Sequence, residues 1–352
     1  SVQLHRFLSF AILNDRVQNT SGILRKRKKR KHGMNYIVFD LEWNQSPGGK
    51  KYSNSRLPFE IIEIGAVKMN EKREPVDVFQ RLIKPQVYNW IHDSIHEVIH
   101  VDYKDLADGL PFPEAVREFL DWCGDDFAFF TWGNQDVMEL QRNMKYYDLL
   151  FLLPGPVKYY DVQKVFGMCC KEAGGRRSLE FAIDQLDIPK EQTFHRALTD
   201  ARYTAMVLKW VDEKTLFTNY SMDVYQNPKK KKDELFLSYP DHDQYVSREF
   251  TDRDKIMRDR EVTSTKCPIC HLPAKRKIRW FMNNSKAYES ISLCQKHGYV
   301  KGKIRIRHTE EDRYYVIKTL KNVGNEKAEE IREKRDSLRK KRQIKRKSEK
   351  QI

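Results

Sequence analysis

Between residue 34 and about residue 218, apolar residues follow two alternating patterns. Short runs that are continuously apolar, or that alternate with polar residues, predict strands at 35–40 (NYIVFD), 61–69 (IIEIGAVKM), 79–85 (FQRLIKP) and 127–132 (FAFFTW). Apolar residues three or four positions apart predict helices at 114–123, from about 135, from Ser178 to about 186, and from 197 to 212. Alternating strands and helices indicate an α/β domain over 34–218.

The rest of the chain lacks this alternation. Residues 219–262 are polar and contain KKKK at 229–232, which indicates a partly helical linker. Residues 263–321 are predicted to form a small β-rich domain. The charged tail, 322–352, has few apolar residues to bury, so we expect a lone helix or a disordered segment. Residues 1–33 contain the basic run RKRKKRK and are expected to be a disordered extension.

Charge is distributed unevenly along the chain. The 352 residues, enough for about two domains, carry 66 Lys and Arg against 50 Asp and Glu, a net charge of +16. Counted by segment, the net charge is +8 for 1–33, −7 for 34–218, −1 for 219–262, +10 for 263–321 and +6 for 322–352. An acidic domain between basic ends indicates a polyanionic partner.

Composition also excludes several classes of protein. No apolar run approaches the roughly 18 residues of a membrane-spanning helix, and six cysteines are too few for a disulfide-rich secreted scaffold. The apolar stretch RFLSFAIL precedes the basic run, which is the wrong order for a signal peptide. We therefore expect a soluble, cytoplasmic protein.

Three acidic residues follow or end predicted strands. Asp40 and Glu42 project from one face of a strand, roughly 6–7 Å apart, and repel each other unless a cation lies between them. A lone pair of this kind is more simply explained as two solvated acids at a strand end. Asp136 comes just past a buried strand, where α/β sheets bind ligands, although the helix dipole alone could favour an acid there.

His195 and Asp200 complete the set. Five positions apart, they cannot share one face of a helix, but they can converge if His195 lies on the loop before the helix. Four acids and one histidine suit a single chemistry, because Mg²⁺ prefers a few carboxylates and phosphate oxygens. Two such ions about 3.5–4 Å apart can promote phosphodiester hydrolysis, with histidine accepting a proton from water.

The segments FDLEW, IIEIGAV, TWGNQD and HRALTDA resemble, in this order and spacing, the DEDDh 3′–5′ exonucleases. The resemblance covers about 34–215 and is greatest to the KapD-type, short-RNA-trimming branch. It implies a ribonuclease H-like fold, a mixed sheet flanked by helices. It also implies two Mg²⁺ or Mn²⁺ ions and release of 5′-mononucleotides from a 3′ end. By position, the resemblance makes His195 the general base and assigns metal binding to Asp40, Glu42, Asp136 and Asp200.

Two pairs of metal-ligand residues lie in the C-terminal part. Cys267 and Cys270 form one pair, and Cys294 and His297 form the other, with 23 residues between the two pairs. Three thiolates and one imidazole suit one structural Zn²⁺ in a zinc-ribbon-like domain. Incidental cysteines are the alternative explanation, and the adjacent His271 is an alternative ligand.

Two basic strands are predicted in the same domain. In one, basic residues alternate with Gly or Ile: Lys301, Lys303, Arg305 and Arg307. In the other, Lys275, Lys277 and Arg279 precede Trp280. Cations on one strand face can follow successive phosphates, and an aromatic ring beside them can stack on an unpaired base. A solvated strand face with Trp280 in a small core explains the pattern equally well.

These features favour a two-metal 3′–5′ exonuclease acting on single-stranded nucleic acid, RNA more than DNA. An alternative is a nucleic-acid-binding adaptor with an inactive exonuclease-like domain, but a degenerate site would be expected to lack at least one acid. A ribonuclease H-type endonuclease is a third possibility, against which the position of His195 argues.

Overall fold

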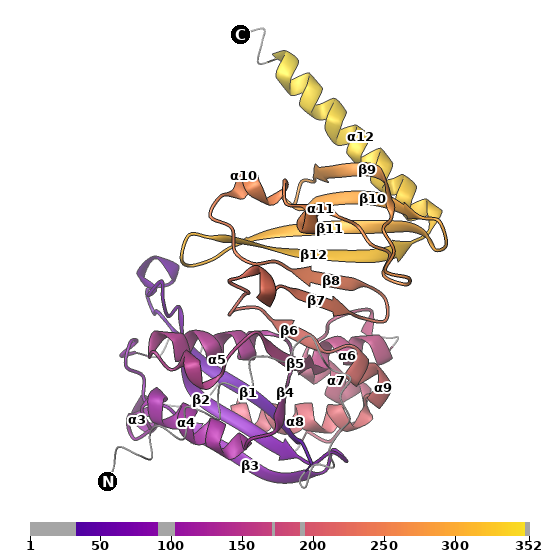
Figure 1. Cartoon of the computed structure of the whole chain (residues 1–352). Coiled ribbons are helices and arrows are strands. Elements are labelled where there is room, and N and C mark those ends of the chain that lie inside the picture. Colours follow the sequence, from indigo (N-terminus) through magenta and orange to yellow (C-terminus); the bar gives the residue numbers. More distant parts are fainter. Residues whose placement is uncertain (1–32, 91–102, 171–172, 191–193, 349–352) are drawn as a thin grey trace, which may run out of the picture. The chain divides into compact units, whose positions relative to one another are not determined.

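The computed structural model describes residues 33–90, 103–170, 173–190 and 194–348 (Figure 1). By internal contacts the chain divides into Ser1–Met34 and Asn35–Ile352. All helices and strands named below belong to the second unit. Except for Gly33, the predicted disordered extension lies outside the described residues.

The first sheet is mixed, as predicted, and has the order β3-β2-β1-β4-β5-β6. Its strands are β1 (Asn35–Gln45), β2 (Phe59–Met69), β3 (Pro75–Leu82), β4 (Phe127–Thr131), β5 (Val157–Asp161) and β6 (Ser221–Asp223). β1, β4 and β5 are parallel, whereas β2, β3 and β6 pair antiparallel to their neighbours. The α/β prediction is therefore confirmed.

Helices cover both faces of this sheet. They are α3 (Tyr103–Ala107), α4 (Phe112–Cys123), α5 (Gln135–Tyr146), α6 (Val162–Cys169), α7 (Leu179–Gln185), α8 (Ala197–Trp210) and α9 (Glu213–Thr218), with short 3₁₀ turns η2 (Lys50–Tyr52) and η3 (Leu150–Leu152). The β1 side chains Ile37, Phe39 and Leu41 pack with α4 and α5 in the main core. Because side chains alternate along a strand, Asp40 and Glu42 project from the opposite face, on which α8 packs.

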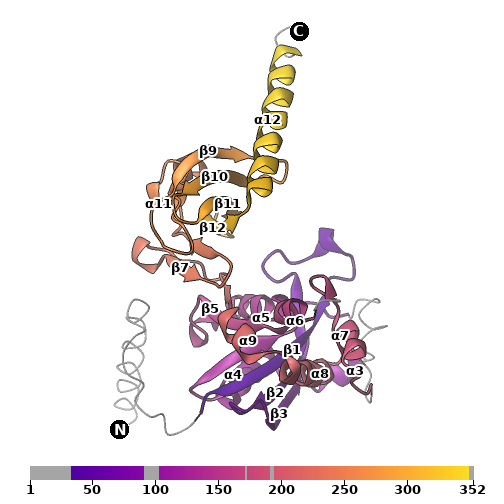
Figure 2. The ribbon, with the colours of Figure 1, turned by 90° about the vertical axis from the view of Figure 1, so that its right-hand side faces the viewer.

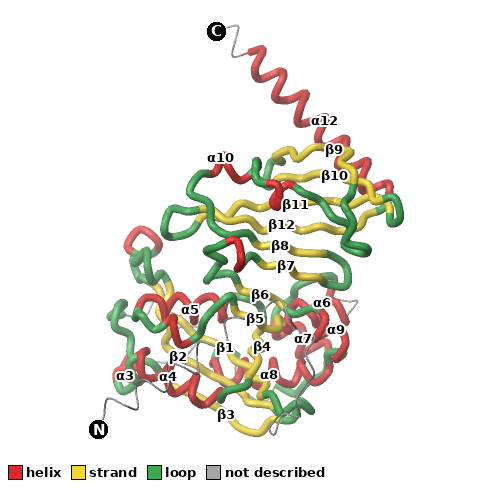
Figure 3. Tube along the Cα trace, viewed as in Figure 1, coloured by secondary structure: helices red, strands yellow, loops and turns green. Residues whose placement is uncertain are grey.

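The second sheet has the strand order β7-β8-β12-β11-β10-β9 (Figure 3). All of its neighbouring strands pair antiparallel. Its strands are β7 (Leu235–Ser238), β8 (Asp243–Val246), β9 (Lys275–Met282), β10 (Tyr288–Cys294), β11 (Gly298–His308) and β12 (Tyr314–Val323). The 3₁₀ turn η5 (Lys231–Asp233) precedes β7, and the short helices α10 (Arg253–Ile256) and α11 (Arg260–Thr263) lie between β8 and β9 in sequence. Ile256, Val262, Ile304 and Val316 form part of its core.

The segment 219–262 is not a linker. Its β6 extends the first sheet, and its β7 and β8 extend the second. Tyr245 and Val246 are almost fully buried. Polar composition concealed these strands because each is only three or four residues long.

The C-terminal tail is a helix, α12 (Asn325–Ser348), visible in two views (Figures 1 and 2). Its first turns are not isolated, since Ala328 and Ile331 pack against Ile278 and Ile291 of the second sheet. These two small apolar contacts are easily overlooked in a segment that is otherwise charged.

Candidate active site and metal centres

The candidate active site lies at the end of β1, where β1 extends beyond its neighbour β4. The pairing between β1 and β4 ends at Val38 and Phe130, yet β1 continues to Gln45. Past Val38, the backbone of β1 therefore has no β4 partner. Instead, the Leu41 N–H donates a hydrogen bond to Asp136 Oδ1, at 3.3 Å.

Asp136 is supplied by the first turn of α5 and is 5% exposed. β4 ends at Thr131, and the chain reverses through Gly133, whose φ of 113° strongly favours glycine. The Thr131 hydroxyl donates to the Gly133 carbonyl at 2.7 Å and stabilises this turn. The strand-to-helix turn thus places Asp136 beside the end of β1.

Asp200 is supplied by α8, which lies unusually close to the sheet. A Cβ on Gly65 of β2 would lie 2.0 Å from the Leu198 nitrogen, so only glycine fits there. Gly65 is the register partner of Asp40. The close approach at Gly65 therefore brings the first turn of α8, with Asp200, to the strand that carries Asp40.

The loop before α8 is held by an ion pair. Arg196 contacts the buried Glu63 carboxylate through Nε at 3.0 Å and Nη2 at 3.2 Å. Glu63 is the register partner of Glu42. The neighbouring His195 has a φ of 68°, and its N–H donates to Asp200 Oδ2 at 3.3 Å. This arrangement fixes the backbone of His195 at the edge of the acidic cluster.

The five predicted residues line one cavity of about 340 Å³, and they are Asp40, Glu42, Asp136, His195 and Asp200. Carboxylate oxygens of Asp40, Glu42 and Asp200 lie within 4.8 Å of one another. Asp136 lies outside that tight group, on the opposite edge of β1, and His195 is exposed.

The electrostatics of this cluster are unfavourable without a cation. Burial, followed by repulsion from Asp136 and Glu42, raises the pKa of Asp40 well above its ordinary value. Burial and neighbouring acids raise the pKa of Glu42 to about 8 and that of Asp136 to about 7. Burial also raises the pKa of Asp200 to about 6. A bound cation would remove this penalty by favouring the ionised carboxylates.

The donor set fits a hard divalent cation. All candidate ligand atoms are carboxylate oxygens, the ligands that Mg²⁺ and Mn²⁺ prefer. In addition, Asp200 Oδ1 is buried and has no hydrogen-bond partner among the described residues. A buried carboxylate oxygen without a partner is costly, and a cation at this position would satisfy it.

Sequence reasoning missed part of the cavity wall, which also includes Trp132, Asn134 and Gln163. Gln163 follows the end of β5, so the rule that located Asp136 past β4 would have found it, had β5 been predicted. Arg176 donates to Gln163 Oε1 at 2.6 Å and to the buried Asp161 at 2.5 Å. These contacts fix the wall formed by α6. Trp43 also lines the cavity, with its ring 6.0 Å from that of Phe59.

The four predicted zinc ligands form a second cluster. Cys267 Sγ and His297 Nδ1 are 3.5 Å apart, Cys270 Sγ and Cys294 Sγ 3.7 Å, and Cys294 Sγ and His297 Nδ1 3.8 Å. A tetrahedral ion with Zn–S of about 2.3 Å and Zn–N of about 2.0–2.1 Å gives ligand separations of this size. Burial acts to raise the pKa of Cys294, but hydrogen bonds from the Lys296 and His297 backbone lower it to about 6. The alternative ligand His271 is outside the cluster.

The two predicted basic strands differ in the structure. Lys303, Arg305 and Arg307 have no ion pair within the described part of the chain, whereas Lys301 lies 3.6 Å from Glu289. Lys275, Lys277 and Arg279 are exposed on β9, an edge strand whose register shifts twice.

Trp280 is half-buried, and its contacts favour the alternative in which it packs in the small core over stacking on a base. Its indole N–H donates to the Thr263 carbonyl at 2.9 Å. The ring packs over Gly302, where an added Cβ would lie 2.4 Å from the Trp280 ring. Trp280 therefore belongs to the core of the second sheet.

The fold and the acidic cavity define an α/β domain of the ribonuclease H-like class with a cleft suited to cations. Residues 37–208 match the family model RNase_T, described as "Exonuclease". The segment that carries the acidic cavity is therefore similar to that exonuclease family.

Several solved structures are similar to this chain. One is a 3′-exonuclease described in "3'-end specific recognition of histone mRNA stem-loop" (16% identity, 51% of this chain, 82% of that chain, TM-score 0.42). Another is the nuclease domain of 3′hExo, "a DEDDh family member, bound to rAMP" (18% identity, 51% of this chain, 92% of that chain, TM-score 0.43). A third is cell-death related nuclease 4, CRN-4 (16% identity, 56% of this chain, 71% of that chain, TM-score 0.43). No curated protein matches the chain.

Among the described residues, no helix is both long enough and apolar enough to pass through a membrane.

Proposed function

We propose that the protein shortens single-stranded nucleic acid from its 3′ end and releases 5′-mononucleotides, with RNA preferred over DNA. The convergence of the four acids and His195 in one cavity carries this proposal. The preference for RNA is supported by the sequence resemblance to the RNA-trimming branch.

In this proposal Asp40, Glu42, Asp136 and Asp200 hold two Mg²⁺ or Mn²⁺ ions. When bound, such ions neutralise phosphate charge and acidify the attacking water. His195, exposed beside Asp200, accepts the proton from that water as general base. The hydrogen bond from its own N–H to Asp200 and the Arg196–Glu63 ion pair keep the histidine near the scissile phosphate.

The test is a time course with 3′- and 5′-labelled single-stranded RNA and DNA, with Mg²⁺, with Mn²⁺ or without divalent ions. A metal-dependent ladder that shortens from the 3′ end, and is lost in His195→Ala, is the expected result. Comparing the cleavage rates of the RNA and the DNA substrate measures the preference for RNA. Binding without any cleavage would favour the inactive adaptor instead.

We further propose one structural Zn²⁺ on Cys267, Cys270, Cys294 and His297, and phosphate contacts along β11. The ligand separations support the zinc site. The unpaired cations Arg305 and Arg307 support the phosphate contacts. Replacing either arginine by Ala should weaken binding equally for all sequences and reduce the salt slope by about 1. A cytoplasmic location is consistent with six cysteines that form no disulfide.

A further inference from the structure

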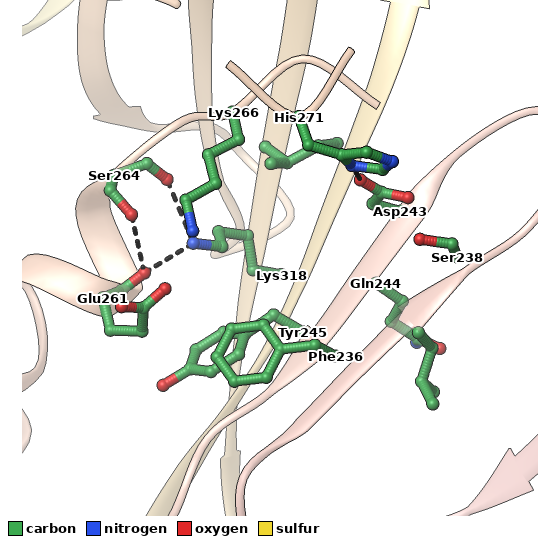
Figure 4. Close-up of a pocket in the computed structure, with 12 residues that line it drawn as sticks. Phe236, Ser238, Asp243, Gln244, Tyr245, Glu261, Ser264, Lys266, His271 and Lys318 are labelled. Carbon is green, nitrogen blue, oxygen red and sulfur yellow. Dashed lines mark hydrogen bonds and ion pairs between the residues drawn. The ribbon is translucent and has the colours of Figure 1, made fainter. Parts of the chain in front are cut away.

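A second cavity, of about 290 Å³, lies on the second sheet (Figure 4). Phe236, Asp243, Tyr245, Lys266, His271 and Lys318 contribute to its wall, and we call it the aromatic cavity. These residues come from β7, β8, β12 and the segment that carries Cys267 and Cys270. Its volume is at the small end for ligand sites, which run from about 300 to 1,000 Å³, so it suits a ligand of one ring system.

One wall of the cavity is aromatic. The Phe236 side chain is 62% exposed, although it is large and apolar. Its ring centroid lies 4.9 Å from that of Tyr245, which is 3% exposed (Figure 4). The buried tyrosine thus supports the exposed phenylalanine, so that the orientation of Phe236 is set before any ligand arrives.

The other wall carries donors and acceptors. Lys318 is 4% exposed, and its ammonium group donates to the carbonyls of Glu261, at 2.5 Å, and Ser264, at 3.0 Å. The two carbonyls use two of the three N–H donors of the ammonium group, and Nζ lies 4.8 Å from the centroid of the Tyr245 ring. Asp243 Oδ1 is buried and has no hydrogen-bond partner among the described residues, while Oδ2 lies 3.5 Å from His271 Nδ1.

This combination excludes several ligands. The buried ammonium and carboxylate disfavour a purely apolar ligand, because their polar atoms would stay unsatisfied. The carboxylates of Asp243 and Glu261 balance the two lysines of the wall, so a free anion such as phosphate gains little net attraction. A flat ring whose edge offers both donors and acceptors satisfies both walls, and nucleobases have this character. The exposed Lys266 stands beside Lys318, where it can meet a phosphate of the same strand (Figure 4).

We propose that the aromatic cavity binds one unpaired nucleobase of a single-stranded nucleic acid, stacked on Phe236. The inference rests on the proposed nucleic-acid substrate. It assigns the stacking function to Phe236 in place of Trp280. Base–aromatic stacking is worth about 1–3 kcal/mol per base, so Phe236→Ala should weaken binding about fivefold to 150-fold.

The test measures binding of labelled single-stranded RNA to the full chain carrying Asp40→Ala, which prevents hydrolysis. Phe236→Ala should weaken binding without changing its salt dependence, because stacking releases no counterions. Phe236→Trp, which keeps an aromatic ring at this position, should bind as the parent does. The matched control is Phe151→Ala, since Phe151 is 69% exposed and lies outside both cavities. Unchanged zinc content and melting temperature would show that each variant is folded.

A set of RNAs, each with one abasic position, locates the bound base. Removing the base at one position should weaken binding to the chain that retains Phe236 and have no effect on binding to the Phe236→Ala variant. Equal binding by both chains, or equal abasic penalties in both, would overturn the proposal. Cleavage is measured separately with Asp40 intact, so that a failure of the exonuclease proposal leaves the binding result readable.

Discussion

Asp40 is the residue on which the acidic cluster converges. It shares the tight carboxylate group with Glu42 and Asp200, and Asp136 also acts on its charge. We expect Asp40→Ala to lower the rate of hydrolysis by roughly 100-fold or more while RNA binding stays close to that of the parent. Steady-state cleavage and binding titration measure the two effects. Asp121→Ala, which removes an exposed acid, is the control, and substantial turnover by Asp40→Ala would remove this residue from the metal site.

The raised carboxylate pKa values also predict how stability depends on pH. In the folded chain the pKa is about 6 for Asp200, 7 for Asp136 and 8 for Glu42, against ordinary values of 3.8, 3.8 and 4.5. Between these limits the folded state binds more protons than the unfolded state, so the free energy of unfolding decreases as pH rises. Without divalent ions, melting temperature should therefore fall from about pH 4 to pH 8.

Added Mg²⁺ should raise the melting temperature more at pH 8 than at pH 5, because the ion binds ionised carboxylates. Thermal melting at both pH values, with and without Mg²⁺, measures the difference. A Mg²⁺ effect that is independent of pH would contradict the assignment of this cluster as the metal site.

Among the elements, α8 packs closely on β2 only because Gly65 of β2 has a hydrogen atom in place of a side chain. Gly65→Ala would place a methyl group 2.0 Å from the backbone of Leu198, so α8 must move away. We expect a loss of about 1–3 kcal/mol in the free energy of unfolding and a larger proportional loss in kcat, since Asp200 moves with the helix. The control is Gly324→Ala, where an added Cβ meets nothing within 4 Å. Unchanged kcat in a destabilised Gly65→Ala would show that the spacing is not critical.

The Arg196–Glu63 ion pair is the other link at this end of α8. Arg196→Met removes the charged partner of a carboxylate that is 1% exposed and leaves, among the described residues, only the neutral donor Gln80. Glu63 should then repel Glu42 and loosen the His195 loop. We expect kcat to fall about tenfold or more with a smaller change in KM. Restoration of kcat in the double variant Arg196→Met, Glu63→Gln would identify charge as the cause, and a parental rate in the single variant would exclude a positioning role.

Sequence patterns revealed the elements whose side chains carry periodic signals. The apolar run at 127–132 gave β4, and Ser178 was confirmed as the N-cap of α7, where its hydroxyl accepts from the Phe181 N–H at 3.2 Å. The order of the five candidate residues located the cavity. The sequence could not decide between core packing and base stacking for Trp280, because its packing depends on Gly302, a partner on another strand. Nor could β6 to β8 be predicted, because each has only three or four residues and they lie within a segment of polar composition.

At the scale of the whole chain, the thiolate–imidazole cluster stabilises the second sheet. Cys267, Cys294, Val300 and Leu320 form one of its cores, so replacing Cys267 and Cys294 together by Ser should unfold this sheet and abolish binding of the proposed zinc. RNA binding should weaken, while the first sheet, with its own core, stays folded. Zinc analysis and limited proteolysis test this. Zinc bound as in the parent would show that the ligands are assigned wrongly.

Two clusters of different chemistry in one chain also change the meaning of a common experiment. Oxygen ligands exchange hard ions readily, whereas three thiolates and an imidazole retain a soft one. A chelator titration should therefore inhibit in two stages: a first that added Mg²⁺ reverses at once, and a second that needs zinc and refolding. Inhibition by excess chelator alone thus cannot be taken as evidence for the catalytic ions, because the same treatment would also remove the proposed zinc and unfold the second sheet.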